Sequence, residues 1–127
     1  MKLIKERIET FPIPKDPGKG KLKIRYLNAG QRQELLQDVN EVKYSVLEGK
    51  EEATVIPNGV ELRRAVVIAR IVDWENMFDN EGKKLECTDE NKIAFSCMDG
   101  FMDILQVMIN KLDKMVEADL KKERKNS

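Results

Sequence analysis

The stretch MDGFMDILQVMINKLDKMV, residues 98–116, decides the fold because it carries the strongest regular apolar pattern in the chain. Apolar residues recur at alternating steps of three and four, the spacing of one face of an α-helix. This first row consists of Met98, Phe101, Leu105, Met108, Leu112 and Met115. A second row at steps of seven lies beside it, formed by Met102, Ile109 and Val116. The sequence therefore predicts an amphipathic helix with a wide apolar face.

The limits of this helix follow from its flanking residues. Thr88 is a suitable N-cap, so we expect the helix to run over about 89–120. Gly100 is a mild defect inside it, which costs about 1 kcal/mol relative to alanine. The charged segment 121–127 is expected to be a frayed tail.

The N-terminal third has the signals of a β-hairpin. KLKIRYL, residues 21–27, alternates strictly, with Leu22, Ile24 and Tyr26 on one face and basic residues on the other. Residues 10–14 read as extended because residues before proline avoid the helical region. KDPGKGK, residues 15–21, is a turn by composition. We therefore expect an antiparallel hairpin over 1–27.

The middle of the chain predicts a helix over 29–48. Asn28 and Gln31 match a capping box, and Leu35, Val39, Val42 and Val46 follow at helical steps. Gly49 is placed for a C-terminal cap. EEATVI, residues 51–56, is compatible with a short strand, closed by a turn over 57–59.

VELRRAVVIARIVDW, residues 60–74, has two interpretations. Its apolar spacing fits a helical face, but VVIARIV alone would also suit a buried strand, since short apolar runs do not discriminate. Length and the adjacent arginines favour a helix over 60–73. The expected fold is α+β in a single domain, 1–127: a small N-terminal antiparallel sheet over 1–27, a mainly helical part over 28–122 with about three helices, and the tail.

Composition excludes several classes of protein. Lys plus Arg and Asp plus Glu both number 23, so the basic surplus of a general nucleic-acid binder is missing. No apolar run reaches the ~18 residues of a transmembrane helix, and the N-terminus lacks the apolar core of a signal peptide. We therefore expect a cytoplasmic protein that binds neither nucleic acid nor a membrane.

The residues available for chemistry are few. Histidine is absent, and Cys87 and Cys97 are the only cysteines. A structural zinc site needs more ligands than this, and the cysteines should be free thiols in a reducing compartment. The absence of histidine removes the commonest general base and the Ser/His and Cys/His nucleophile pairs. We expect no enzyme, no catalytic or metal-ligating residues and no cofactor.

Two loops resemble ligand-binding motifs. If Gly82 stood at position six of an EF-hand loop, positions one and twelve would be Met77 and Thr88, where calcium needs oxygen donors such as carboxylates. Residues 79–82, Asp-Asn-Glu-Gly, are therefore better interpreted as a turn. GKGK, residues 18–21, precedes a strand, whereas a P-loop follows a strand and precedes a helix.

Several short motifs together resemble small phage proteins of the tail assembly chaperone group. The matching stretches are an extended FPIP, the strand-to-helix segment YLNAGQRQELL, and the loop FDNEGKKLECTDEN that follows a tryptophan. The resemblance covers about residues 10–35 and 60–100, and Asp73 departs from it, since a small residue often precedes the tryptophan in that group. The matching positions are Trp74, Asp79, Gly82, Leu85, Thr88, Glu90 and Asn91.

The resemblance implies a non-enzymatic chaperone in the host bacterial cytoplasm that binds the phage tape-measure protein and the major tail protein. It leaves a homo-oligomer open. The alternative from another class is a virion structural protein, such as a tail-completion or head–tail connector protein.

The helix over 89–120 is the first candidate for the protein-binding surface, because one apolar row is sufficient for packing and Met102, Ile109 and Val116 would then face a partner. Trp74 and Phe78 form the second candidate surface, although a lone tryptophan is usually a core residue. The candidate binding residues are Phe101, Met102, Leu105, Met108, Ile109, Leu112, Trp74 and Phe78.

Overall fold

The computed structural model describes residues 3–4, 6–47, 50–57 and 59–126. Strands β1, β2 and β5 form an antiparallel sheet in the order β1-β2-β5, and β3 and β4 form a separate two-stranded ribbon. The α+β class and the N-terminal hairpin are confirmed. In chain order the elements are β1 (Ile8–Pro12), β2 (Lys21–Arg25), α1 (Ala29–Val39), β3 (Asn40–Leu47), β4 (Lys50–Pro57), α2 (Gly59–Arg70), β5 (Ile71–Glu75), α3 (Asp89–Ser96) and α4 (Phe101–Asn126).

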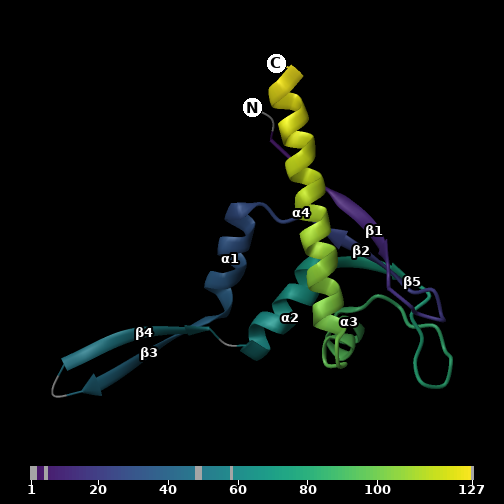
Figure 1. The fold of residues 1–127 in the computed structure, drawn as a ribbon. Helices are drawn as coiled ribbons and strands as arrows, with labels where there is room; N and C mark the ends of the chain where they lie inside the picture. Colours follow the sequence, from purple (N-terminus) through teal and green to yellow (C-terminus); the bar gives the residue numbers. More distant parts are fainter. Residues whose placement is uncertain (1–2, 5, 48–49, 58, 127) are drawn as a thin grey trace.

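One core joins the sheet to α2 and α4. Pairing places Phe11, Leu22 and Trp74 opposite one another across the three strands, and therefore on one face of the sheet. Helix α4 runs past the sheet and continues beyond it towards the C-terminus (Figure 1). The buried apolar cluster consists of Leu22, Ile24, Val67, Ile71, Trp74, Met77, Phe101, Leu105, Met108, Ile109, Leu112 and Val116.

The predicted helix over 29–48 is wrong in its second half. Helix α1 ends at Val39, and β3 begins at Asn40. The steps of three and four between Val39, Val42 and Val46 concealed a second pattern, because Val42, Tyr44 and Val46 also alternate with polar residues at a period of two. β-Branched and aromatic residues at that period favour a strand.

The remaining predictions for residues 28–59 concern a capping box, a short strand, a helix cap and a turn. The capping box is confirmed: the Asn28 N–H donates to Oε1 of Gln31 and the Gln31 N–H donates to Oδ1 of Asn28, both at 2.9 Å. The strand expected over 51–56 lies within β4. The cap predicted at Gly49 and the turn through Asn58 lie outside the described residues. The ribbon projects from the rest of the molecule (Figure 1).

The ambiguous segment 60–74 is partly helix and partly strand. Helix α2 ends at Arg70, so residues 71–73, predicted as helix, belong to β5. The chain changes from helix to strand at Ile71, which pairs with Ile24 of β2 and is fully buried. Arg70 is also buried, and its guanidinium Nη1 donates to the Arg25 carbonyl at 3.2 Å. Burial lowers the pKa of Arg70, and the nearby Asp113 carboxylate opposes that shift.

The single helix predicted over 89–120 is two helices. Thr88 caps α3 as expected, since its hydroxyl accepts from the Asn91 N–H at 3.2 Å. The chain then turns at Gly100, whose φ is +80°, and α4 starts at Phe101. Gly100 therefore separates two helices instead of being a mild defect within one, and its backbone conformation is one that only glycine adopts readily. Helix α4 continues to Asn126, through most of the segment predicted to fray.

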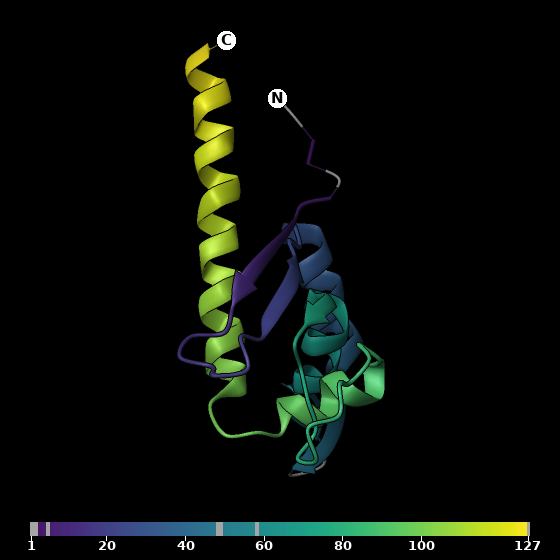
Figure 2. The same ribbon diagram turned by 90° about the vertical axis from the view of Figure 1, so that its right-hand side faces the viewer.

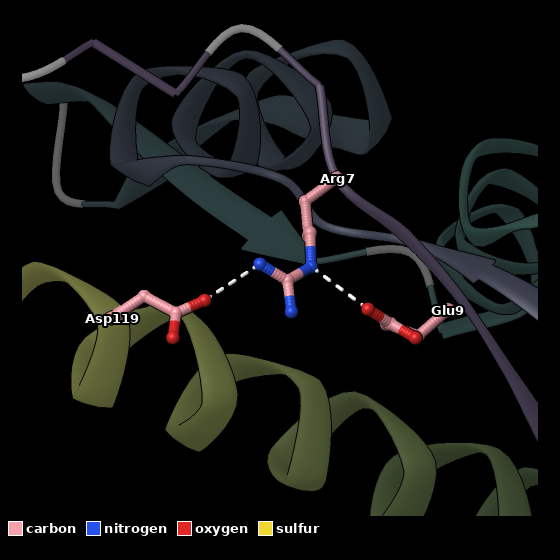
Figure 3. A network of polar contacts seen from close by, with 3 residues as sticks. All are labelled: Arg7, Glu9 and Asp119. Carbon is pink, nitrogen blue, oxygen red and sulfur yellow. Dashed lines mark hydrogen bonds and ion pairs between the residues drawn. The ribbon is translucent and has the colours of Figure 1, made fainter.

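A polar network ties the segment before β1 to the C-terminal half of α4 (Figure 3). The Arg7 guanidinium donates from Nη1 to Oδ2 of Asp119 at 2.7 Å and from Nε to Oε1 of Glu9 at 2.9 Å. The hydrogen bond to Asp119, followed by that to Glu9, raises the pKa of Arg7.

In the described part of the chain, no single helix is long and apolar enough to cross a membrane. Helices α3 and α4 meet that measure only as a pair bent by 108°.

Candidate functional site

An apolar groove of about 430 Å³ opens where three segments meet beside the start of α4. We call it the corner groove. Its segments are the β1–β2 turn, the chain after β5, and the connection between α3 and α4; Figure 2 shows the turn and the connection at the same end of α4. The groove is lined by Ile13, Pro14, Lys15, Asp16, Pro17, Gly18, Asn76, Met77, Phe78, Phe95, Met98, Asp99, Phe101 and Ile104.

The β1–β2 turn forms a fixed wall of the groove. The Asp16 carboxylate accepts from the Gly18 N–H at 3.2 Å and from the Gly20 N–H at 2.8 Å. Lys15 and Lys19 have φ values of 58° and 56°, a left-handed conformation that is uncommon for residues other than glycine. Strained backbone of this kind persists only where its surroundings hold it, and it gathers at functional sites.

The chain after β5 is held against that turn. Asn76 is also left-handed, with φ 57°, and its Nδ2 donates to the Lys19 carbonyl at 3.1 Å. Of the three left-handed residues other than glycine among those described, Lys15 and Asn76 line the corner groove, and the third, Lys19, lies in the same turn as Lys15. Two residues further on, Phe78 leaves 42% of its surface in solvent at the groove wall.

The loop after Phe78 is the turn that its sequence indicates. Asp79 Oδ1 accepts from the N–H groups of Glu81 at 2.9 Å and Lys83 at 2.8 Å, and Gly82 has φ 81°. Within the described residues, no group of three or more Asp, Glu, Cys or His side chains is arranged to hold a metal ion. The carboxylate of Asp79 thus serves to close the loop.

The corner between α3 and α4 supplies the third wall. Phe95 packs edge-on to Trp74, with ring centroids 5.2 Å apart, and stacks on Phe101 at 5.8 Å. Trp74 is 7% exposed, and its Nε1 donates to the Leu85 carbonyl at 2.9 Å, so its interpretation as a core residue is confirmed. Met98 lies on the turn itself and is 58% exposed. Phe95 and Phe101 thus line the same groove as this exposed methionine.

The structure separates the predicted site residues into two groups. Phe101 and Phe78 come together in the corner groove. Leu105, Met108 and Leu112 are buried in the core, and Met102 is half-buried. The expectation that the second helix row faces solvent is wrong for Ile109 and Val116, because both are buried where α4 packs on the domain. Both rows of the helix therefore belong largely to the core.

Sequence reasoning missed most of the groove wall. Met98 was included in the apolar row but not among the candidate binding residues, and Lys15, Asp16 and Asp99 were not considered as site residues. The available signal was Gly100, since a glycine that ends a helix would have placed Met98 on a corner outside the helical face.

A second cavity, of about 560 Å³, lies between β5 and the segment 84–87. Charged residues line much of it, including Asp73, Lys84 and Glu86. Cys87 lies at its edge; burial raises the pKa of this thiol and keeps it in the unreactive protonated form. Both cysteines are free thiols, as predicted. The corner groove is the better candidate for binding because two of its exposed residues, Phe78 and Met98, are large and apolar.

A scan against protein-family models, a search of curated proteins and a search of solved structures each found no match to this chain.

Proposed function

We propose that this protein is a non-enzymatic chaperone for phage tail assembly, which binds apolar helical segments of the tape-measure protein through the corner groove and also binds the major tail protein. The observation that carries the proposal is the pair of exposed apolar side chains, Phe78 and Met98, which come from two different segments of a groove with a fixed wall. The sequence resemblance to tail assembly chaperones supplies the identity of the clients.

The groove suits a helical client for physical reasons. Its walls are held by hydrogen bonds between side chains and backbone, so little ordering entropy is lost when a partner binds. A methionine side chain adapts to varied apolar partners, which a chaperone needs, and an aromatic ring provides an anchor. A cavity of about 430 Å³ is large enough for one or two apolar side chains of an amphipathic helix.

The role implies that the protein acts in the host bacterial cytoplasm before the tail forms and is not retained in the particle. Mass spectrometry of purified virions should therefore find the tape-measure protein and the major tail protein but not this chain. Stoichiometric recovery of the chain in virions would contradict the chaperone role and favour a virion structural protein.

Binding is tested by co-expression with the tape-measure protein encoded in the same genome. Met98→Asp and Phe78→Asp should each abolish its co-purification. The melting temperature should stay near that of the wild type, because Met98 is 58% and Phe78 42% exposed. Val107→Asp is the matched control, since Val107 is 50% exposed on α4 but does not line the groove. Equal loss of binding in the control, or undiminished binding by both groove variants, would overturn the assignment.

One observation favours the alternative, a virion structural protein. Strands β3 and β4 pair only with each other among the described elements, so each has an outer edge without a strand partner. Such edges are templates for pairing with a neighbouring subunit, as in ring-shaped assemblies. This reading predicts that the chain stays in the particle, and the virion measurement decides between the two.

A further inference from the structure

The exposed charges that border the corner groove have opposite signs on its two sides. The third charged residue of the lining, Asp16, is half-buried, and its carboxylate accepts from the Gly18 and Gly20 N–H groups. Lys15 lies on the β1–β2 turn, and Asp99 lies on the corner between α3 and α4. Both side chains are exposed, and neither makes an ion pair with another residue that the structure describes. The exposed apolar residues Phe78 and Met98 belong to the same groove.

A surface of this kind is complementary to itself. A two-fold axis through the groove brings residue i of one copy to residue j of the other, and residue j to residue i. Lys15 of each copy then meets Asp99 of its partner, while the apolar side chains meet in the centre. A rim with charges of one sign would instead repel its own copy. The exposed charges Lys15 and Asp99 are therefore compatible with an isologous contact.

We propose that a second copy of this chain covers the corner groove in the free protein, in a two-fold dimer with the pairs Lys15–Asp99 and Asp99–Lys15. The contact is small and exchanges readily, because only two large apolar side chains per copy are exposed there. Self-association covers the apolar surface until another apolar segment displaces the partner copy. This second step, displacement by a client, rests on the proposed function; the dimer itself does not.

Charge reversal gives the sharpest test, with the dimer measured by sedimentation velocity over a concentration series at low salt. Lys15→Glu places two acidic residues on the rim, and Asp99→Lys places two basic residues there. Each variant alone should dimerise about tenfold or more weakly than the wild type, because both ion pairs become repulsive. Mixed in equal amounts, the two variants should form a heterodimer of near wild-type strength, and the double variant should recover as a homodimer.

Salt and an apolar variant provide the controls. The loss of dimer affinity caused by Lys15→Glu should become smaller at high salt, because salt screens interactions between exposed charges. If Asp99→Lys lowers the melting temperature, the salt dependence of Lys15→Glu alone tests the ion pairs. Met98→Asp should leave the chain monomeric, whereas Val107→Asp should dimerise as the wild type does, since Val107 lies outside the groove.

The outcomes separate the dimer from the proposed function. A wild-type chain that is monomeric at all concentrations, or variants that fail to restore each other on mixing, would overturn the dimer while leaving client binding intact. A dimer that follows the charge rules but is not displaced by the tape-measure protein would support self-association and count against the proposed function.

Discussion

Leu105 and Leu112 in the middle of α4 are fully buried, whereas Met98, on the turn that precedes the same helix, is 58% exposed. All three belong to one apolar row in the sequence. The difference arises from what lies opposite: the sheet and α2 cover the middle of the helix, and the turn at Gly100 carries Met98 away from them. A helical apolar row therefore identifies core and binding surface together, and only the packing partners tell them apart.

The largest expected effect tests the buried half of this comparison. Leu112→Ala should lower the free energy of unfolding by about 2–5 kcal/mol, because the fully buried side chain leaves a cavity in the core. Met98→Ala should change it by less than about 0.5 kcal/mol, since its side chain is mostly in solvent. Urea denaturation of both variants, followed by circular dichroism, measures the difference.

The same comparison extends to charge. Ile109→Asp and Val116→Asp should prevent stable folding, because each would bury an unpaired carboxylate among apolar side chains. If either variant folded with near wild-type stability, the second row of α4 would face solvent after all, and the original expectation of a helix-wide binding surface would return.

Much of the fold could be predicted from local patterns. The hairpin, the capping box at Asn28, the cap at Thr88 and the turn at Asp79 are each fixed by neighbouring residues, and each is confirmed. The errors lie where two periods coincide. In 39–46 a valine spacing of three and four overlies a period of two, and in 66–72 an apolar run suits either state. Whether such a segment becomes helix or strand depends on its pairing with another strand, which the local sequence does not specify.

The candidate site was harder to predict than the fold. Phe78 and Phe101 were named, but the residues that shape the wall between them are remote in sequence. Lys15 and Asp99 border the same groove although 84 positions separate them (99 minus 15). No local pattern links such residues, since their proximity depends on the hairpin and the α3–α4 corner folding together.

An intermediate effect tests whether the groove wall is as tightly built as the core. A Cβ at Gly20 would lie 2.7 Å from Oδ2 of Asp16 and 3.0 Å from both Cδ1 of Ile13 and Sδ of Met77. Gly20→Ala should therefore cost about 1–3 kcal/mol, because the Asp16 carboxylate that must move also holds the turn. Binding of the tape-measure protein should weaken with it.

Gly18→Ala is the matched control in the same turn, because its Cβ would meet only ordinary contacts at 3.6–3.7 Å. Its stability should stay within about 0.5 kcal/mol of the wild type. Thermal melts of the pair decide the point: equal stability of the two variants would show that the wall yields easily and that its rigidity does not contribute to binding.

The smallest expected change in stability is that of Gly100→Ala, at the turn between Met98 and the buried part of α4. Its direction, a loss or a gain, distinguishes two helices from one. If residues 89–120 were one helix, Gly100→Ala would raise stability by about 1 kcal/mol, since alanine is the better helix former. With φ at +80°, alanine should instead lower stability by about 1 kcal/mol, because a Cβ is strained in the left-handed region. A Cβ there would have no neighbour within 4 Å, so the penalty reports backbone conformation alone.

Gly30→Ala in α1 is the control for this sign, because Gly30 lies in a helix and its Cβ would make only an ordinary contact, at 3.5 Å from Oδ1 of Asn28. Its stability should be unchanged or raised. Opposite signs for the two glycines, measured by urea denaturation, would establish the break between α3 and α4 in solution. A shared rise would mean that the helix is continuous, and Met98 would then return to the core face with the rest of its row, leaving Phe78 alone at the groove.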